Sequence, residues 1–458
     1  MDRRNALKWL GTAAASGAVG VSMEKWAARL QAQAAPVDWA ARIAALPRPA
    51  AGEIAITAVG DMIINSPATG RKGPEVQEMY RVMRDADAAF GNCEEPIGTT
   101  GFMYQKTSQM AWPTILDDHK AAGFNMLSVA NNHYMDLGPD ALAEGIEESH
   151  KRGFAVAGAG RNLDEATTVG IRNVKGVRVG MLAFWCNQGN QGGYADYARA
   201  GRNKPGVAMI SGVQVTVPKS DGTRTSVVLP DASDMQVMAD AVKRARSQVD
   251  FLMVSFHQHW GGGGAPQGLI SDATPAGRGV NHATPRELPP LAATQKITSA
   301  NLNAAVNQVA EGRQIISRAA IDAGADAIIG HGPHVLNGVE VYRGKPIIYS
   351  LGHYYMEITH NGKALPQFEF DPGMVWSVET NWFLEEHRWA AIARMFVRGG
   401  KVTRLDVLPV YMDVQKDGFP YLPTDADCQK INAAMQEMSK PFGAQLKSQG
   451  WYTEVTGL

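Results

Sequence analysis

The stretch "FLMVSFHQHWGGGG", residues 251–264, joins an apolar run of strand-forming residues to two histidines and then to four consecutive glycines. Such a run is typical of a strand that is buried on both faces. On an extended strand His257 and His259 point to the same face, because successive side chains alternate. Glycines let the backbone approach a ligand where a Cβ atom would collide. The stretch therefore predicts a buried strand that delivers imidazoles to a binding site.

Other apolar runs of the chain end in the same way. These predicted strands lie in "IAITAVGDM" (54–62), "ADAAFGNCEEPIG" (86–98), "NMLSVANNH" (125–133), "ADAIIGHGPH" (325–334) and "KPIIYSLGHYY" (345–355). We expect the first strand to stop at Val59 and the third to end at 131–133. Segments with helical patterns lie between them, at 74–84, 114–124, 138–154, 233–248 and 302–323. Strands that alternate with helices of this length indicate a layered α/β fold.

Residues that can bind a metal or a ligand follow each predicted strand. They are Asp61; Asn92 and Glu94; Asn132 and His133; His257 and His259; His331 and His334; and His353. Singly each has a structural explanation, since aspartate is common in turns, an acidic pair is often solvated and a lone histidine is often a core residue. Sites in open α/β sheets form outside the carboxyl ends of the strands. We therefore expect these residues to meet at one edge of the sheet.

The residue types indicate which ion such a site would bind. Mixed carboxylate, imidazole and amide ligands suit zinc, manganese or iron better than calcium. The set is larger than a single tetrahedral ion requires. Two ions about 3.5–4 Å apart that share a carboxylate would use all of it. We therefore predict one or two divalent metal ions, with the sequence leaving their identity open.

Composition excludes several classes of partner. The 458 residues carry a formal net charge of -1, which gives no reason to expect a nucleic acid or an anionic membrane as partner. The three cysteines include no CxxC pair and predict no disulfide framework. "VAGAGRN" (156–162) lacks the third glycine of a dinucleotide-binding fingerprint. A soluble globular protein with a small-molecule or polymer substrate fits this composition best.

The N-terminus predicts export. Arg3 and Arg4 precede a mildly apolar stretch that is too short to span a membrane, and "AQA" at 32–34 offers a cleavage site. This pattern resembles a twin-arginine (Tat) signal peptide over residues 1–34, and the alternative is a basic helix retained on the mature protein. We expect a periplasmic or extracellular protein with no membrane span in its mature form.

The remainder of the chain divides into three expected parts. Residues 35–53 read as a linker, 54–410 as the main domain and 411–458 as a largely helical C-terminal extension. Within the main domain, 211–230 has the pattern of an inserted hairpin, and 261–298 is rich in glycine, proline and threonine. We expect the latter to be a long functional loop.

Several of these motifs resemble a known family. "AVGDMI", "NCEEPIG", "SVANNHYMDLG", "AGAGRNLDEA" and "GADAIIGHGPHVLNGVEVYRGKPIIYSLG" stand in the order and approximate spacing of the capsule-synthesis CapA family, between Ile54 and Tyr355. That family is linked to poly-γ-glutamate capsule formation, and its fold is similar to that of the calcineurin-like metallophosphoesterases. The resemblance implies a layered sandwich of mixed β-sheets flanked by helices.

The resemblance also assigns roles to residues. It implies six metal ligands: Asp61, Glu94, Asn132, His259, His331 and His334. Glu94 would be the bridging carboxylate. His133 would contact the substrate or leaving group, with Asp136 orienting it through a hydrogen bond. His257 and His353 replace or supplement residues of the family pattern and are candidates for further ligands.

Two functions follow from these observations. The first is a periplasmic metal-dependent hydrolase that cleaves an amide, γ-glutamyl or phosphoester bond through a metal-activated water. The second is a non-catalytic accessory protein of poly-γ-glutamate or capsule polymer synthesis or export. The clustered site residues favour the enzyme, whereas the family's link to capsule formation favours the accessory protein.

Overall fold

The computed structural model describes residues 37–71, 73–101, 110–187, 192–218, 224–258, 309, 311–357, 359–360, 363–364, 388–412 and 418–458. The chain divides into two compact units, 1–44 and 45–458. Of the first unit the structure describes residues 37–44, which contain helix α3 (Trp39–Ala44). The expected signal peptide (1–34) and the expected long loop (261–298) lie outside the described residues.

The larger unit contains a first mixed sheet. In spatial order its strands are β21 (Gln445–Ser448), β22 (Thr453–Thr456), β19 (Lys401–Met412), β18 (Trp389–Arg398), β1 (Ile54–Ile63), β2 (Ala88–Cys93), β3 (Met126–Ser128) and β4 (Ala155–Ala157), with β15 (His353–Met356) paired to β1 and β20 (Pro420–Tyr421) paired to β19. Pairing is parallel from β1 to β4 and between β1 and β15. It is antiparallel from β1 through β18 and β19 to the edge.

A second mixed sheet faces the first. Its strands are β10 (Arg224–Pro230), β9 (Met209–Pro218), β7 (Val177–Asn187), β11 (Phe251–Gln258), β12 (Ala327–His331), β14 (Lys345–Leu351) and β13 (Leu336–Tyr342), with β6 (Gly170–Val174) paired to β7. The central strands are parallel, and the expected hairpin at 211–230 is confirmed as the antiparallel pair β9–β10. Two short ladders, β5 (Ala159–Gly160) with β8 (Gly206–Val207) and β16 (Thr359–His360) with β17 (Lys363–Ala364), complete the described strands.

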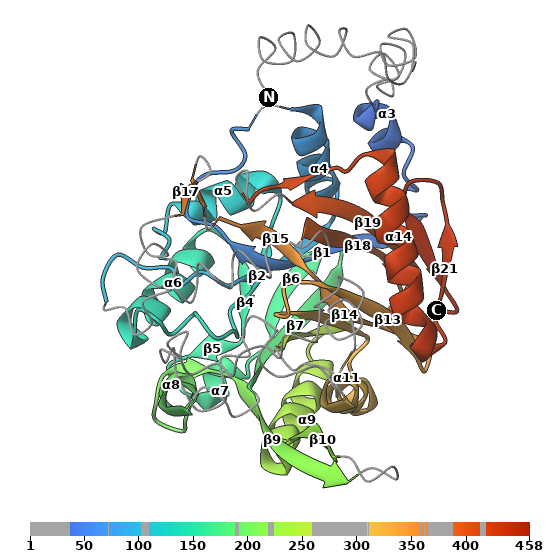
Figure 1. Ribbon diagram of the computed structural model, residues 1–458. Coiled ribbons are helices and arrows are strands. Elements are labelled where there is room, and N and C mark those ends of the chain that lie inside the picture. The colour runs from blue at the N-terminus through green and yellow to red at the C-terminus, as the bar shows by residue number, and fades with distance from the viewer. Residues whose placement is uncertain are drawn as a thin grey trace, which may run out of the picture. The chain divides into compact units, whose positions relative to one another are not determined.

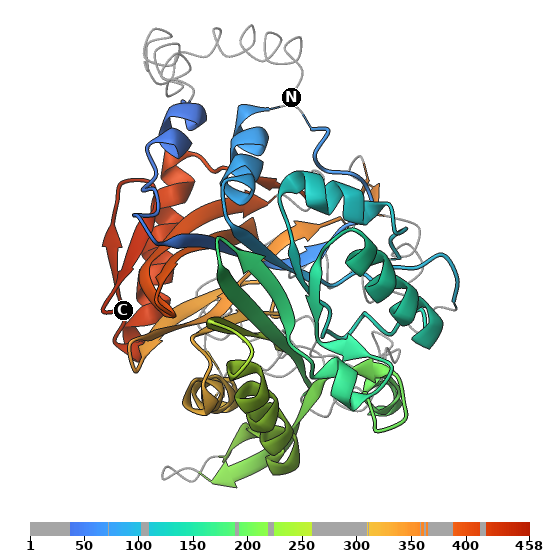
Figure 2. The ribbon, with the colours of Figure 1, turned by 180° about the vertical axis from the view of Figure 1, so that it is seen from behind.

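Helices cover the outer faces of both sheets (Figures 1 and 2). The described helices of this unit are α4 (Pro74–Arg84), α5 (Ile115–Ala122), α6 (Pro139–Lys151), α7 (Leu163–Ala166), α8 (Gly192–Ala198), α9 (Ala232–Arg246), α11 (Glu311–Ala323), α14 (Asp425–Ser439) and the 3-10 turn η3 (Lys440–Phe442). α4 and α5 lie over the first sheet, and α9 and α11 pack on the second. The order helix, sheet, sheet, helix confirms the predicted layered α/β sandwich. None of the described helices combines the length and apolar character that a bilayer span requires.

Strict alternation of side chains along the strands turns several of the candidate ligand residues into the space between the sheets. Along β11, Phe251 and Met253 join the core between the two sheets, whereas Leu252, Val254 and Phe256 join the core beneath α9 and α11. Continuing the first series reaches Ser255 and His257. The same count along β2, from Ala88 and Phe90, reaches Asn92 and Glu94. Side-chain period alone therefore turns these polar residues inward.

β1 reaches the same face by a different device. Ile54, Ile56 and Ala58 lie in the core between the sheets, so strict alternation would turn Asp61 outward. The pairing of β1 with β2 shifts register between Ala58 and Asp61. A Cβ atom on Gly60 would lie 1.8 Å from the carbonyl oxygen of Gly352, so only glycine fits this irregularity. The bulge reverses the count and brings Asp61 inward.

Four sequence expectations differ from the structure. The first strand does not stop at residue 59 but continues to Ile63, and the third ends at Ser128 rather than at 131–133. The candidate ligands do not share one sheet edge: they come from two facing sheets, because β1–β3 pair in one ladder and β7, β11, β12 and β14 pair in the other. The segment 411–458 contains the expected helix as α14, but β20, β21 and β22 also add strands to the first sheet.

Candidate metal centre

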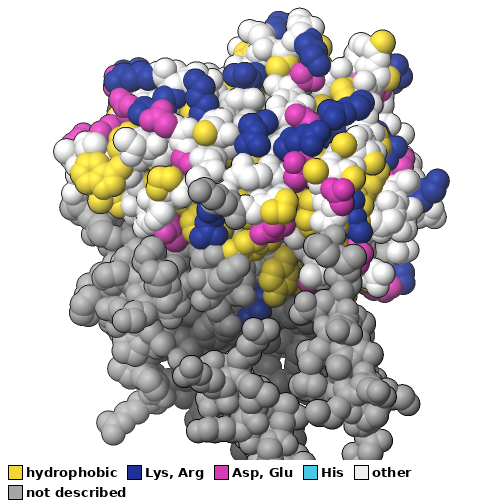
Figure 3. Space-filling view, turned by 90° about the horizontal axis from the view of Figure 1, so that it is seen from above, with side chains coloured by type: hydrophobic (Ala, Val, Ile, Leu, Met, Phe, Trp, Pro, Cys, Tyr) yellow, Lys and Arg dark blue, Asp and Glu magenta, His cyan; other side chains and the backbone are white. Residues whose placement is uncertain are grey.

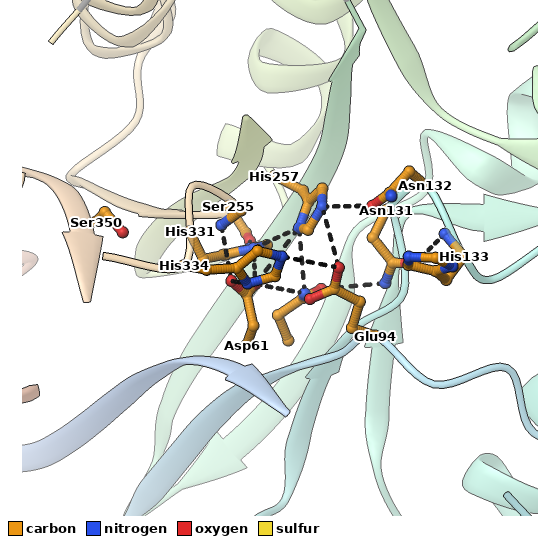
Figure 4. Close-up of polar contacts among 12 residues, drawn as sticks. Asp61, Glu94, Asn131, Asn132, His133, Ser255, His257, His331, His334 and Ser350 are labelled. Atoms are coloured by element: carbon orange, nitrogen blue, oxygen red, sulfur yellow. Dashed lines mark hydrogen bonds and ion pairs between the residues drawn. The ribbon is translucent and has the colours of Figure 1, made fainter. Parts of the chain in front are cut away.

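Five ionisable side chains from remote parts of the chain meet between the sheets (Figure 4). We call them the inter-sheet cluster: Asp61, Glu94, His257, His331 and His334. Asp61, His257 and His331 are fully buried, and Glu94 and His334 are 1% and 5% exposed. Burying this much ionisable surface is costly unless the groups satisfy one another or hold an ion.

One oxygen of Asp61 binds three side chains. Its Oδ1 accepts a hydrogen bond from Asn92 Nδ2 at 2.9 Å. The same oxygen lies 3.0 Å from His331 Nδ1 and 3.4 Å from His257 Nδ1. The Asn92 amide also lies 3.3 Å from His257 Nδ1. Asp61 is thus the centre from which the imidazoles are arranged.

The other oxygen of Asp61 is held by backbone and by a third imidazole. Its Oδ2 accepts a hydrogen bond from the Gly332 amide at 2.9 Å and lies 3.2 Å from His334 Nδ1. Burial favours the protonated carboxyl group, but hydrogen bonds from His257, His331 and His334 outweigh it and hold the pKa of Asp61 well below its usual value. The carboxylate is therefore ionised at neutral pH, as a metal ligand must be.

Glu94 faces Asp61 across the cluster. It follows β2, and its backbone amide donates to the carbonyl of Met62, which fixes it to β1. Its Oε1 lies 3.5 Å from His257 Nε2 and 4.0 Å from His334 Nε2. Ligand atoms of Asp61, Glu94 and His334 all lie within 4.8 Å of one another. The two carboxylates thus share imidazole neighbours.

His257 occupies the middle of the cluster. Its Nδ1 lies 3.0 Å from His331 Nδ1, and its Nε2 lies 2.7 Å from Asn132 Oδ1. His331 Nε2 in turn lies 2.7 Å from Ser255 Oγ. The sequence treated His257 only as an additional candidate and assigned a ligand role to His259, which lies outside the described residues. Among the described residues His257 has the contacts that a ligand at this position requires.

His334 and His353 form a stacked pair beside Asp61. Their ring centroids lie 5.0 Å apart with an interplanar angle of 23°. His353 pairs in register with Asp61 between β1 and β15 and is fully buried. His334 has φ of 57°, in the left-handed region that non-glycine residues rarely adopt. Such backbone strain persists where surrounding structure enforces it, which is common at ligand sites.

His133 lies at the edge of the cluster and is 22% exposed in its side chain. Its Nδ1 lies 2.8 Å from Asp136 Oδ2, so the expected hydrogen bond is present. The hydroxyl of Tyr194 on α8 donates to the other oxygen of Asp136. Burial raises the pKa of Asp136, although the hydrogen bonds from His133 and Tyr194 act in the opposite direction. The Asp136 carboxyl group thus fixes the orientation of the His133 ring through its Nδ1 atom.

Asn131 fixes the turn that carries these residues. Its Nδ2 donates to Asn92 Oδ1 at 3.2 Å and to the carbonyl of Cys93 at 2.9 Å. Its Oδ1 accepts hydrogen bonds from the backbone amides of His133 at 3.0 Å and Tyr134 at 2.9 Å. Beyond the end of β3, the Asn131 side chain therefore takes over from backbone pairing and holds the turn against β2.

Sequence reasoning assigned no role to Asn131, Ser255, Tyr194 or Gly332. Ser255 could have been found from the period of β11, since it stands two residues before His257. Asn131 lies inside a quoted motif but has the composition of an ordinary turn. Tyr194 comes from a separate helix, 58 residues from Asp136, and no spacing in the sequence indicates that contact.

The residues present fit a divalent metal ion. Two groups of three ligand atoms, from Asp61, His257 and His331 and from Asp61, Glu94 and His334, each lie within 4.8 Å. Carboxylate and imidazole donors are those that zinc, manganese and iron accept. Among the described residues, Asp61 forms its ion pairs with histidines and none with lysine or arginine. This buried carboxylate has the negative charge that a metal cation would balance.

Comparisons with known proteins bear on this geometry. The sequence profile of the family described as bacterial capsule synthesis protein PGA_cap matches residues 52–267 and 302–357, more than half of the chain. An uncharacterized protein, y4sH, of Sinorhizobium fredii (strain NBRC 101917 / NGR234) is 24% identical over 85% of this chain and 90% of its own length.

Two relatives have names that refer to capsule synthesis. The PGA biosynthesis protein CapA of Bacillus subtilis (strain 168) is 27% identical, over 65% of this chain and 62% of that protein. The capsule biosynthesis protein CapA of Bacillus anthracis is 24% identical, over 67% of this chain and 60% of that protein. The expected resemblance is confirmed: the chain belongs to the bacterial capsule synthesis (PGA_cap, CapA) family, whose fold is metallophosphoesterase-like.

Proposed function

We propose that this chain is a metal-dependent hydrolase that cleaves an amide, γ-glutamyl or phosphoester bond with a water activated by one or two divalent ions. The observation that carries the proposal is the inter-sheet cluster. Two buried carboxylates and three imidazoles have been gathered from both sheets into one site. A protein that only serves as a scaffold has no need to bear the cost of burying such groups together.

The cluster would hold the ions through Asp61, Glu94, His257, His331 and His334. Asn132 is a further proposed ligand, since its Oδ1 is directed to the same imidazole of His257 (Figure 4). His259 stays a predicted ligand outside the described residues, and His353 stays a candidate behind His334. A divalent ion in such a donor set acts as a Lewis acid and lowers the pKa of water.

His133 would move a proton for the leaving group. Its Nδ1 proton is directed to Asp136, which leaves Nε2 as the ring nitrogen that can accept or donate a proton. Asp136 is itself held by the Tyr194 hydroxyl, so the imidazole cannot rotate freely. As the partly exposed member of this group, His133 is the residue that an entering substrate would meet.

The accessory-protein alternative requires a surface for an anionic polymer. Lys and Arg side chains are spread over the face seen in Figure 3, with Asp and Glu side chains between them. Arg81 illustrates the pattern, since it forms ion pairs with Glu78 and Asp85. On the described part of this face, cations that are neutralised in this way do not form the continuous basic track that a polyanion would follow.

A hydrolysis screen with metal analysis tests the proposal. Purified protein is expected to contain one to two equivalents of zinc, manganese or iron that the His331→Ala variant lacks. Metal-stripped protein reloaded with each ion is assayed on phosphoesters, γ-glutamyl peptides and esters, with His150→Ala as an exposed histidine control. Turnover that requires metal and His331 supports the enzyme. Metal without turnover on any substrate favours the accessory protein, and failure to take up any ion contradicts both the site and its chemistry.

Export is the second part of the proposal. The Arg3-Arg4 pair, the short apolar stretch and the "AQA" site support Tat-dependent export to the periplasm or beyond. Replacing both arginines with lysine is expected to leave the protein inside the cell with its N-terminus uncleaved. Fractionation and N-terminal sequencing measure this outcome, and unchanged export of the double variant would contradict it.

A further inference from the structure

The segment that carries Glu94 has a second group of metal-binding residue types on its opposite face. β2 ends at Cys93, and Glu94 and Glu95 follow it directly. Asn92 and Glu94 point between the sheets, so continued alternation turns Cys93 and Glu95 to the outer face, on the side of α5. There they meet His119 of α5. All three side chains are buried, with exposures of 0%, 1% and 0%. We call Cys93, Glu95 and His119 the outer-face cluster.

The geometry of this cluster suits one small cation. His119 Nε2 lies 2.9 Å from Glu95 Oε1, and the Cys93 Sγ lies 3.8 Å from the Glu95 carbonyl oxygen. One ligand atom from each residue lies within 4.8 Å of the others. Bonds of roughly 2.0–2.3 Å to zinc keep donors within about 4.6 Å of one another, so a small side-chain adjustment closes the set. Thiolate, imidazole and carboxylate together favour zinc over magnesium or calcium.

Two buried polar atoms of the cluster have no hydrogen-bond partner among the described residues. They are Oε2 of Glu95 and Nδ1 of His119, and the nearby buried hydroxyl of Tyr134 shares this condition. A buried polar atom left unpaired costs about 1–3 kcal/mol, so several at one place call for a water molecule or an ion. A cation bound by Glu95 would pair the free carboxylate oxygen directly.

Within the described part of the chain, one basic side chain compensates the charge of Glu95: His119 is the group that forms an ion pair with it. The rings of Phe124 and Tyr355 pack against His119, with centroids 6.2 and 6.4 Å away, and close the cluster with apolar surface.

We propose that Cys93, Glu95 and His119 bind a zinc-class divalent ion of their own, separate from the inter-sheet cluster. Cys93 and Glu95 flank Glu94 in sequence, so an ion on the outer face would fix the backbone that presents Glu94 inward. The site is structural: it has no exposed atom for a substrate to reach. The inference stands apart from the proposed hydrolysis, because it requires binding and no turnover.

Cobalt substitution tests the proposal. A cobalt ion bound to a thiolate gives an intense near-ultraviolet charge-transfer band, and the described inter-sheet donors contain no sulfur. Protein produced in cobalt-containing medium is expected to show this band. The Cys93→Ser variant is expected to lose it together with one equivalent of metal, whereas Asp61→Asn is expected to keep it. Cys186→Ser and Cys428→Ser, which replace the other two buried cysteines, are the matched controls.

Each outcome decides the proposal. Absence of the band in wild-type protein that contains cobalt would overturn it without any variant, and so would a band that survives Cys93→Ser. If Cys93→Ser does not fold, Glu95→Gln replaces it and is expected to lose one equivalent of metal. Loss of hydrolysis or of metal in His331→Ala with the band intact would concern the inter-sheet site alone.

Discussion

The inter-sheet cluster and the outer-face cluster treat a buried carboxyl group in opposite ways. In the inter-sheet cluster three imidazoles surround Asp61, and their hydrogen bonds overcome burial so that its pKa lies well below the usual value. In the outer-face cluster a single imidazole contacts Glu95, and burial prevails, so that its pKa is raised. The number of donors decides the outcome, since both side chains are equally buried. Asp61 is ionised before any metal arrives, whereas Glu95 needs a proton or a cation.

The largest effect is expected from removing the charge at the centre of the inter-sheet cluster. Asp61→Asn keeps the shape of the side chain but leaves three imidazoles without their carboxylate. We expect loss of the inter-sheet metal and a fall in hydrolysis of more than ~100-fold, which exceeds the cost of losing an outer partner. Metal analysis and kcat/KM measure it, with the exposed Asp140→Asn on α6 as the control. An Asp61→Asn variant that keeps both its metal content and its kcat/KM would contradict the central role of the Asp61 carboxylate in the inter-sheet cluster.

The next effect concerns the bulge that turns Asp61 inward. Gly60→Ala forces a Cβ atom onto the carbonyl oxygen of Gly352, so β1 must shift. We expect destabilisation of about 1–3 kcal/mol, the usual cost of overpacking, together with weaker binding of the inter-sheet metal. Urea unfolding and metal titration measure both. Gly70→Ala is the control, because a Cβ atom there meets no neighbour within 4 Å. Equal behaviour of the two variants would show that the bulge does not position Asp61.

A smaller effect is expected at the edge of the inter-sheet cluster. Tyr194→Phe removes the hydroxyl that donates to Asp136 and leaves the His133–Asp136 hydrogen bond in place. We expect kcat to fall by roughly 10-fold with metal content unchanged, as for loss of an outer hydrogen bond. Tyr197→Phe on the same helix is the matched control. A drop in metal content would mean that Tyr194 supports the ligands rather than the proton-transferring imidazole.

The smallest effect is a pair of opposite pH dependences in metal-stripped protein. The folded pKa of Asp61 is depressed from 3.8, so its contribution to stability is present above that pH and is lost as pH falls through the folded value. The folded pKa of Glu95 is raised from 4.5, so its contribution is present below that pH and is lost as pH rises through the folded value. Relative to Asp61→Asn, wild type should lose stability on acidification; relative to Glu95→Gln, it should lose stability as pH rises. Slopes of the same sign for both variants would contradict the contrast.

The elements of the fold follow from local patterns. α4 begins at Pro74 and ends at Arg84, and α6 begins at Pro139, because proline at the first turn marks a helix start that needs no other part of the chain. The buried strands were equally visible as apolar runs. The division of these strands between two sheets could not be predicted, because parallel pairing joins segments far apart in the sequence and the apolar runs resemble one another.

The site could be predicted in kind but not in detail. Asp61, Glu94, His331 and His334 were identified from their positions after strands, and the structure brings them together. His257 was identified only as an additional candidate, and the predicted ligand His259 lies outside the described residues. The bulge at Gly60 and the contact of Tyr194 depend on neighbours that no local pattern encodes. The outer-face cluster escaped because His119 looks like an ordinary helical residue until α5 is packed on the sheet.

Anomalous diffraction from crystals grown with zinc or manganese tests the central claim most directly. Data collected at the absorption edge of the added ion identify its position without reference to activity. The account predicts a peak enclosed by Asp61, Glu94, His257, His331 and His334. A fully ordered inter-sheet cluster with no anomalous peak, in crystals soaked with each ion at saturating concentration, would contradict it.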